Sequence, residues 1–159
     1  MRDTVRLGIV LLLASVANAQ LKPTSLTGTW SLTEVKTTGP NGRTIGNVTG
    51  LLIFTGNHYS RLYIASDQPR KALEDQTKAT AAELLAVWGP VVAASGAYDI
   101  SGNTVNLRAT VAKNPQFMGP SAIGVYSFKL EGNKLSMTEV RNSNGPITNP
   151  ATMTYTRVE

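Results

Sequence analysis

Three side chains able to bind a polar group alternate along one short segment of this sequence. Tyr59, Arg61 and Tyr63 lie two residues apart, a spacing that puts them on the same face of a β-strand. Two phenols and a guanidinium on one face would suit an acidic or polar-headed ligand, because arginine binds carboxylates and phosphates through paired hydrogen bonds. Alternation alone does not orient the strand, so this face either lines an interior or lies on an ordinary polar surface.

Other polar and aromatic residues occur in segments that are also expected to be strands. Glu139 and Arg141 share one face and form either an inward polar pair or a solvated one. Arg108 is a second arginine able to hold a polar ligand head, and Tyr98 and Tyr126 would add ring area to a core or a cavity wall. The candidate ligand-binding residues are therefore Tyr59, Arg61, Tyr63, Tyr98, Arg108, Tyr126 and Glu139.

The residue counts argue against most catalytic and metal chemistry. The 159 residues include no cysteine and one histidine, which excludes disulfides, thiol nucleophiles, cysteine-based zinc sites and histidine clusters. His58 has no acidic neighbour in sequence and is expected at a turn or on the surface. The sequence has no glycine-rich phosphate loop, metal-ligand spacing or nucleophile motif. We therefore assign no catalytic residue, no metal site and no cofactor.

The first 19 residues have the pattern of a secretory signal peptide. Arg2 and Arg6 form a positive start, residues 7–16 are apolar, and Ala17-Asn18-Ala19 is a cleavage signal. The apolar run is much shorter than the roughly 20 residues that a transmembrane helix needs, so we expect no membrane span. We predict a leader over residues 1–19, one domain over residues 20–159, and a secreted or periplasmic location.

The charge distribution argues against nucleic-acid binding. The formal net charge is +5, but acidic residues separate the basic ones, and no lysine- or arginine-rich run occurs. We expect a mildly basic solvated surface and a monomer.

Turn signals divide the rest of the chain into short alternating segments. Gly-Asn occurs at 56–57, 102–103 and 132–133, and both residues tolerate the positive φ of a two-residue hairpin. The segment 104–111 is the clearest strand, since its apolar residues occupy every second position. The sequence predicts strands near 27–37, 48–55, 58–65, 95–101, 104–112, 121–131, 134–141 and 151–158.

One segment has helical rather than strand periodicity. Thr80 and Glu83 form a capping box, and apolar residues recur along one helical face as far as Trp88. Gly89-Pro90 should end the helix, so we predict it near residues 80–88, after a polar loop from 67 to 78. Trp88 is expected to pack on the rest of the domain. A second possibility is that the insertion 67–92 forms a lid.

Eight short strands joined mostly by hairpins would leave two unpaired edges in an open sheet. Closing the sheet on itself removes both edges. We therefore predict an all-β fold, an up-and-down antiparallel β-barrel of about eight strands with one inserted helix. A sandwich is the alternative, but sandwiches usually need longer crossing connections. A barrel of this size either fills its interior with side chains or holds one small ligand.

Short motifs occur in order along the chain. Gly28-Thr29-Trp30 starts the first predicted strand, residues 50–60 read G-L-L-I-F-T-G-N-H-Y-S, and residues 95–100 read S-G-A-Y-D-I. With Asn114-Pro115 and the hairpin over 132–137, they resemble the bacterial lipocalin-like domain family from about residue 26 to residue 158. The resemblance implies a lipocalin-like barrel that is closed at one end by Trp30 packed against Arg157.

The sequence also departs from that family. Relatives often carry a histidine in the strand that here reads T-V-N-L-R at 104–108, and an arginine where this chain reads Gly124-Val125-Tyr126. Roles that depend on those groups are not carried over to this chain.

Three functions remain open at this point. The first is an exported barrel that binds or carries a small hydrophobic or amphipathic molecule, with Arg61 or Arg108 fixing its polar end. The second is an isomerase, cyclase or hydrolase on the same barrel, which needs an acid–base pair such as His58 or Tyr59 with Glu139. The third is an interaction protein with a filled barrel. A filled interior would contradict the first two, and an interior carboxylate near a tyrosine or histidine would favour the second.

Overall fold

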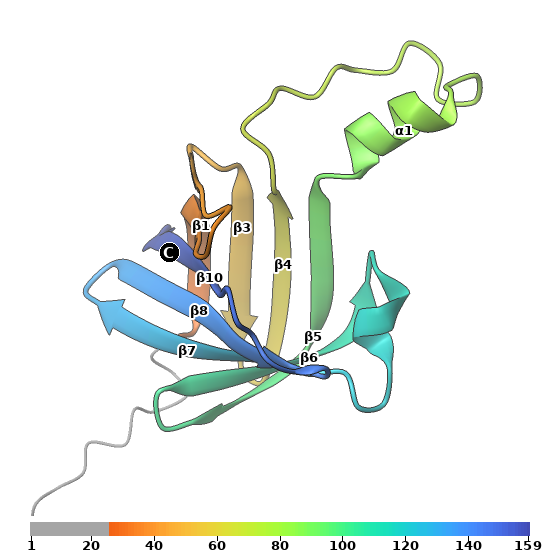
Figure 1. The fold of residues 1–159 in the computed structure, drawn as a ribbon. Coiled ribbons are helices and arrows are strands. Elements are labelled where there is room, and N and C mark those ends of the chain that lie inside the picture. Colours follow the sequence, from red (N-terminus) through yellow and green to blue (C-terminus); the bar gives the residue numbers. More distant parts are fainter. Residues whose placement is uncertain (1–25) are drawn as a thin grey trace, which may run out of the picture.

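The computed structural model describes residues 26–159, so the predicted leader over residues 1–19 lies outside the described residues. The described chain is built almost entirely of β-strands (Figure 1). The strands are β1 (Gly28–Thr37), β2 (Thr44–Gly46), β3 (Gly50–Thr55), β4 (His58–Ile64), β5 (Val91–Ser101), β6 (Thr104–Ala112), β7 (Gly124–Glu131), β8 (Lys134–Asn142), β9 (Gly145–Pro146) and β10 (Ala151–Arg157). One α-helix, α1 (Ala81–Trp88), and one 3₁₀ turn, η2 (Pro115–Met118), interrupt them.

The strands form one closed antiparallel barrel. Neighbouring strands follow the order β10-β1-β3-β4-β5-β6-β7-β8, and β8 pairs in turn with β10. Eight strands therefore complete the ring, while the short β2 and β9 pair only with β1 and β8. Closure satisfies the backbone groups that an open sheet would expose at its edges. The predicted eight-stranded barrel is confirmed, and the sandwich alternative is wrong.

The connections at the two ends of the barrel differ in length. Two-residue turns join β3 to β4, β5 to β6 and β7 to β8, each at a predicted Gly-Asn pair and all at one end. The φ angles of Gly56, Gly102 and Gly132 are 51°, 59° and 58°, whereas the following asparagines keep negative φ. The longer connections, which carry β2, α1, η2 and β9, lie at the opposite end. We call these the tight end and the open end.

The predicted strand positions agree with the structure to within a few residues. The largest difference is at β5, which begins at Val91 rather than near residue 95. The first residues of β5 lack apolar–polar alternation. They nevertheless pair with β4, and the last pair of this register is Ile64 with Val91. Pairing with a neighbouring strand therefore extends β5 beyond the part that its own pattern identifies. The short elements β2, β9 and η2 were not predicted.

The helix forms where the sequence predicts it, but it does not pack as expected. The Thr80 N–H donates to Glu83 Oε2 at 2.8 Å, the Glu83 N–H donates to Thr80 Oγ1 at 3.3 Å, and the helix ends at Trp88. The expectation that Trp88 packs on the barrel is wrong, because no residue of α1 is buried and Trp88 is 49% exposed. Figure 1 shows α1 standing away from the ring beyond the start of β5.

Two side chains hold the C-terminal end of α1. The Lys113 ammonium donates to the carbonyls of Trp88 and Gly89, the latter at 3.0 Å. The Arg70 guanidinium donates to the Val87 carbonyl at 3.2 Å. Cations at these carbonyls also complement the negative end of the helix dipole. Among residues 26–159, no helix is long and apolar enough to cross a membrane, since α1 has only eight residues.

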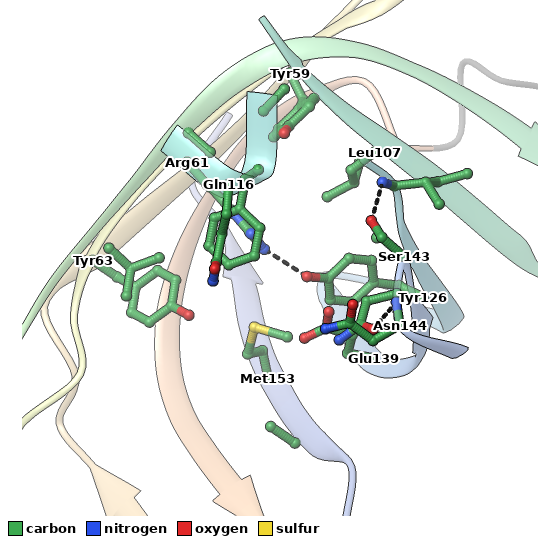
Figure 2. Close-up of a pocket in the computed structure, with 18 residues that line it drawn as sticks. Tyr59, Arg61, Tyr63, Leu107, Gln116, Tyr126, Glu139, Ser143, Asn144 and Met153 are labelled. Atoms are coloured by element: carbon green, nitrogen blue, oxygen red, sulfur yellow. Dashed lines mark hydrogen bonds between the residues drawn. The ribbon is translucent and has the colours of Figure 1, made fainter. Parts of the chain in front are cut away.

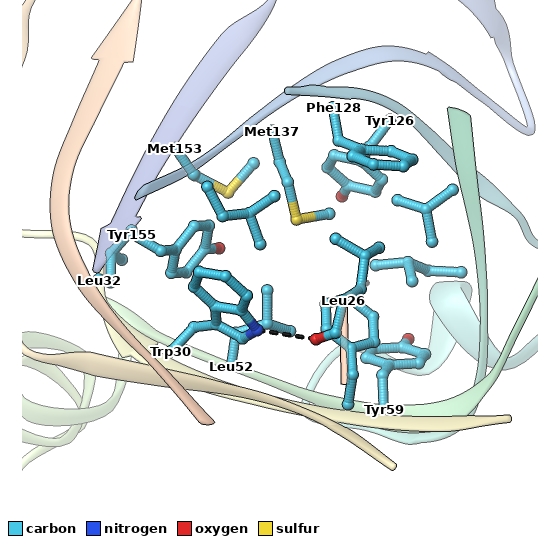
Figure 3. Close-up of a cluster of buried hydrophobic side chains, with 14 of the residues drawn as sticks. Leu26, Trp30, Leu32, Leu52, Tyr59, Tyr126, Phe128, Met137, Met153 and Tyr155 are labelled. Atoms are coloured by element: carbon cyan, nitrogen blue, oxygen red, sulfur yellow. Dashed lines mark hydrogen bonds between the residues drawn. The ribbon is translucent and has the colours of Figure 1, made fainter. Parts of the chain in front are cut away.

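The hydrophobic core fills the tight end of the barrel (Figure 3). Trp30 is completely buried there, and its indole N–H donates to the Leu26 carbonyl at 2.8 Å. Arg157, the pairing partner of Trp30 on β10, places its guanidinium carbon 4.0 Å from the centre of an indole ring. This is the contact that the family resemblance implies, and it combines burial with cation–π attraction.

The two tryptophans provide a matched test of the core. Trp30→Ala should lower the free energy of unfolding by about 3–5 kcal/mol, because it empties a fully buried site. Trp88→Ala should change it by less than about 1 kcal/mol, because the side chain is half exposed. Urea unfolding of the two variants measures both values. Equal losses in the two variants would contradict this account of the core.

The hairpin turns allow a test of backbone strain. Gly102→Ala should destabilise the protein by about 1 kcal/mol, because an L-residue is strained at positive φ. A methyl group at Gly102 meets no atom within 4 Å, so strain is the only cost. Gly46 is equally uncrowded but has no positive φ, which makes Gly46→Ala the control. The control should be neutral or slightly stabilising in the same urea measurement.

Candidate functional site

The open end of the barrel contains a cavity of about 390 Å³. Residues of β4, β5, β6, β7, β8 and β10 line its wall, and the connections that carry η2 and β9 contribute to its mouth. Figure 2 shows the polar members of this lining facing one another across the cavity. The interior is therefore filled at the tight end and hollow at the open end.

The structure settles the orientation of β4. Tyr59, Arg61 and Tyr63 all line the cavity, whereas Leu62 between them is 54% exposed on the outer surface. The inward direction follows from the pairing of β4 with β3, since Arg61 lies opposite the buried Leu52. The polar face of β4 is thus the inner one.

Arg61 is held at one point by a neutral partner. Its Nη1 donates to the Tyr126 hydroxyl at 2.8 Å, and its guanidinium carbon lies 5.7 Å from the centre of the Tyr126 ring. Its Nε atom is buried and has no hydrogen-bond partner among the described residues. No carboxylate of residues 26–159 lies within 4.0 Å of this guanidinium. Arg61 is therefore a cavity-lining cation that forms no ion pair with a described carboxylate, although its charge counteracts the rise that burial causes in the pKa of Glu139 in the same cavity.

Glu139 contributes the carboxyl group of the cavity. It lies on β8 directly opposite Tyr126 on β7, and its side chain faces the interior. Burial raises the pKa of Glu139, while the positive charge of Arg61 and the Tyr126 hydroxyl counteract that rise. The carboxyl group of Glu139 thus lies near the Tyr126 phenol and the Arg61 guanidinium, but it forms no ion pair with Arg61 within 4.0 Å.

The phenols of the interior resist ionisation. Burial raises the pKa of Tyr126 to about 12, despite the nearby charge of Arg61. Burial also raises the pKa of Tyr59 and of Tyr63, again against the effect of Arg61. The pKa of Arg61 is raised in turn: burial opposes its charge, but Tyr126 and Tyr63 outweigh that effect. At neutral pH the cavity therefore presents hydroxyl donors and one cation.

Two of the predicted site residues do not reach the cavity. Arg108 lies between the inward Leu107 and Ala109 on β6, so alternation points it outward, where it pairs with Asp99. Tyr98 is buried nearer the tight end, where its ring packs edge-on against Phe54 with centroids 4.8 Å apart. Its hydroxyl donates to the Gly56 carbonyl at 2.8 Å.

The other polar candidates are divided between the interior and the surface. His58 starts β4 at the tight end and is exposed, as the sequence predicts. Of the pair Glu139 and Arg141, only Glu139 faces the cavity. A bulge in the pairing of β7 with β8, between Val125 and Tyr126, breaks the alternation that would have kept the pair together. Arg141 is exposed.

Sequence reasoning missed four polar residues that form the mouth. Gln116 comes from η2, Asn142 ends β8, and Ser143 and Asn144 follow in the turn after it. Phe117 of η2 lies there too, which is one of the two outcomes that the apolar link over residues 117–120 allowed: a rim over the barrel mouth or a buried plug. The Ser143 hydroxyl accepts a hydrogen bond from the Ile123 N–H at 3.2 Å, which ties two of these connections together. Loop residues carry no periodicity, so no sequence signal places them at a cavity.

The arrangement suits binding of a molecule with one polar end. Among the described residues, no group of three or more histidine or acidic side chains could hold a metal ion. The lining instead combines apolar side chains with polar groups that converge from several strands, and polar groups placed in this way orient a small molecule. The apolar and small lining residues include Val92, Ala94, Leu107, Ala109, Ile123 and Met153.

The raised pKa of Tyr126 predicts a loss of stability at high pH. A phenol that titrates at 10.0 when unfolded and at about 12 when folded stabilises the protein below pH 10. That contribution is lost as the pH rises from about 10 to about 12. Tyr126→Phe should lower stability at pH 8 by about 1 kcal/mol, through loss of the bond to Arg61, and should make the alkaline decline shallower. Urea midpoints measured against pH test this, and parallel declines in the two proteins would contradict it.

Comparison with known proteins adds to this geometry. A solved structure similar to this chain is that of a lipocalin-like protein from Bacteroides uniformis ATCC 8492. The two sequences are 14% identical, the match covers 84% of this chain and 98% of that one, and the TM-score is 0.49. No curated protein matches the chain. The family model described as a lipocalin-like domain matches residues 27–157, so the chain belongs to the lipocalin-like domain family.

Proposed function

We propose that this protein binds or carries one small hydrophobic or amphipathic molecule inside the open end of its barrel. The observation that carries the proposal is the cavity of about 390 Å³ beside an otherwise filled core. Ligand cavities in proteins are typically ~300–1,000 Å³ and mostly apolar, with a few placed polar groups. The cavity favours a ligand over the alternative of a filled barrel that acts only through its loops.

We also propose that the protein acts outside the cytoplasm. This part rests on the signal-peptide pattern of residues 1–19 alone. Folding without cysteine is compatible with export here, because barrel closure and core packing need no disulfide.

An enzyme on the same barrel is the second candidate, and one observation favours it. Glu139 has a raised pKa and lies opposite Tyr126, which in turn contacts Arg61. A carboxyl group with a raised pKa near a phenol is a possible acid–base pair. His58, the other partner considered, is at the far end of the barrel and takes no part in this arrangement.

Native mass spectrometry of the protein purified from its own source tests the proposal. We expect one tightly held small molecule per chain, and a polypeptide mass that lacks residues 1–19. A co-purified molecule that survives incubation unchanged supports carriage, whereas its conversion supports the enzyme. Repeated recovery of an empty barrel, with no binding of added amphiphiles, would contradict both ligand proposals.

Matched variants of β6 locate the binding site. Ala109 lines the cavity, whereas its neighbour Thr110 is exposed on the outer face. Ala109→Phe should fill part of the cavity and reduce ligand occupancy at least tenfold, while Thr110→Phe should leave occupancy unchanged. Retention of the ligand by Ala109→Phe, with the fold intact by circular dichroism, would place binding elsewhere.

A further inference from the structure

We propose that the ligand of this cavity carries a single carboxylate, and that Arg61 is its counter-ion. This inference rests on the proposed function and deepens it by naming the chemical class of the ligand. Arg61 lines the cavity, has unused hydrogen-bond donors, and is the one basic residue among the described lining residues.

The guanidinium of Arg61 has more hydrogen-bonding capacity than the described protein uses. A guanidinium has five N–H donors, and among the described residues Arg61 uses one of them, toward Tyr126. Its Nε is buried without a partner, and no other side chain of residues 26–159 leaves a buried polar atom unpaired. A guanidinium that is partly withdrawn from water and has no carboxylate in contact is costly, so an anion from outside the protein would stabilise this site.

Tyr126 positions Arg61 without neutralising it. The phenol accepts from Nη1 and stays protonated at neutral pH because its pKa is raised. Tyr126 is itself almost fully buried, so its hydroxyl is a fixed point in the wall. The guanidinium is thus oriented in advance for a planar acceptor, which lowers the entropy cost of binding one.

The charges of the lining favour a monoanion over a phosphate. Arg61 is the one basic residue that lines the cavity and Glu139 the one acidic residue, within the described chain. A dianionic head would exceed the available positive charge and would face the Glu139 carboxyl group. A carboxylate carries one negative charge and matches the planar guanidinium through two parallel hydrogen bonds.

Two further phenols can complete the binding of the head group. The hydroxyls of Tyr59 and Tyr63 flank Arg61 on β4 and form no hydrogen bond with the described residues. Both have a raised pKa and so remain donors at neutral pH. Toward the mouth, Val92 and Ile123 offer apolar contact to an aliphatic tail, among the polar side chains of the mouth. A ligand with its head at Arg61 would have its tail toward the open end.

The test compares probes that share a tail and differ in their head group. Decanoate, decanol, decylamine and decyl phosphate are titrated into the full domain by calorimetry, below their micelle concentrations. We expect decanoate to bind at least about tenfold more tightly than the other three, since a charge-assisted hydrogen bond contributes about 1.5–3 kcal/mol. Equal binding of decanol and decanoate would overturn the inference and leave the proposed function intact. Failure of all four probes would overturn both.

Matched variants then assign the effect to Arg61. Arg61→Met removes the charge and keeps an apolar stem, and should weaken decanoate binding at least tenfold while weakening decanol binding much less. Arg108→Met removes an outward arginine that pairs with Asp99, and should change neither. Undiminished decanoate binding by Arg61→Met would overturn the inference.

A second variant keeps the test decisive if Arg61→Met does not fold. Glu139→Gln removes the one acidic group of the lining, and should tighten binding of decanoate more than binding of decanol. Weaker decanoate binding by this variant would mean that Glu139 helps to hold the head group, which contradicts the charge argument.

Discussion

Closure of the sheet is the constraint on which the rest of this structure depends. β10 pairs with β1 on one side and with β8 on the other, so the last strand of the chain joins the two edges that the hairpins leave open. Without that strand the interior would lose one wall, including Met153 of the cavity and Tyr155 of the core. Closure also creates an inside, and a strand of a closed barrel must turn one face toward it.

The asymmetry between the two ends follows from the lengths of the connections. Tight glycine-containing turns bring strand pairs together at one end, where Trp30 and Arg157 close the interior. The longer connections at the opposite end leave room between the strands for a cavity. Stability and binding therefore concentrate at different ends of the barrel: the tight end holds the contact of Trp30 with Arg157, and the open end holds the cavity and its polar side chains.

The polar groups of the cavity reduce the stability of the empty barrel. Arg61 and Glu139 face an interior that aliphatic residues would pack better, and neither forms an ion pair within 4.0 Å in the described chain. Functional sites often contain residues that lower the stability of the fold, because binding requires polar groups that core packing does not. The outward residues Arg108 and Asp99 differ from Arg61 and Glu139, because they form an ion pair with each other and both are exposed to water.

The sequence by itself determined the eight long strands, the helix and their order, but not the short elements β2, β9 and η2. Alternation, Gly-Asn turns and a capping box are local signals, and eight hairpin-linked strands favour closure, so the barrel and α1 were predicted. Three things were decided only by the tertiary structure. They are the inward face of β4, the exposure of Trp88 and the meeting of Arg61 with Tyr126, 65 residues apart in sequence. Alternation with a period of two residues divides a strand into two faces, but it does not say which face points into the barrel. Contacts between strands that are distant in sequence depend on the pairing register, which no local sequence pattern contains.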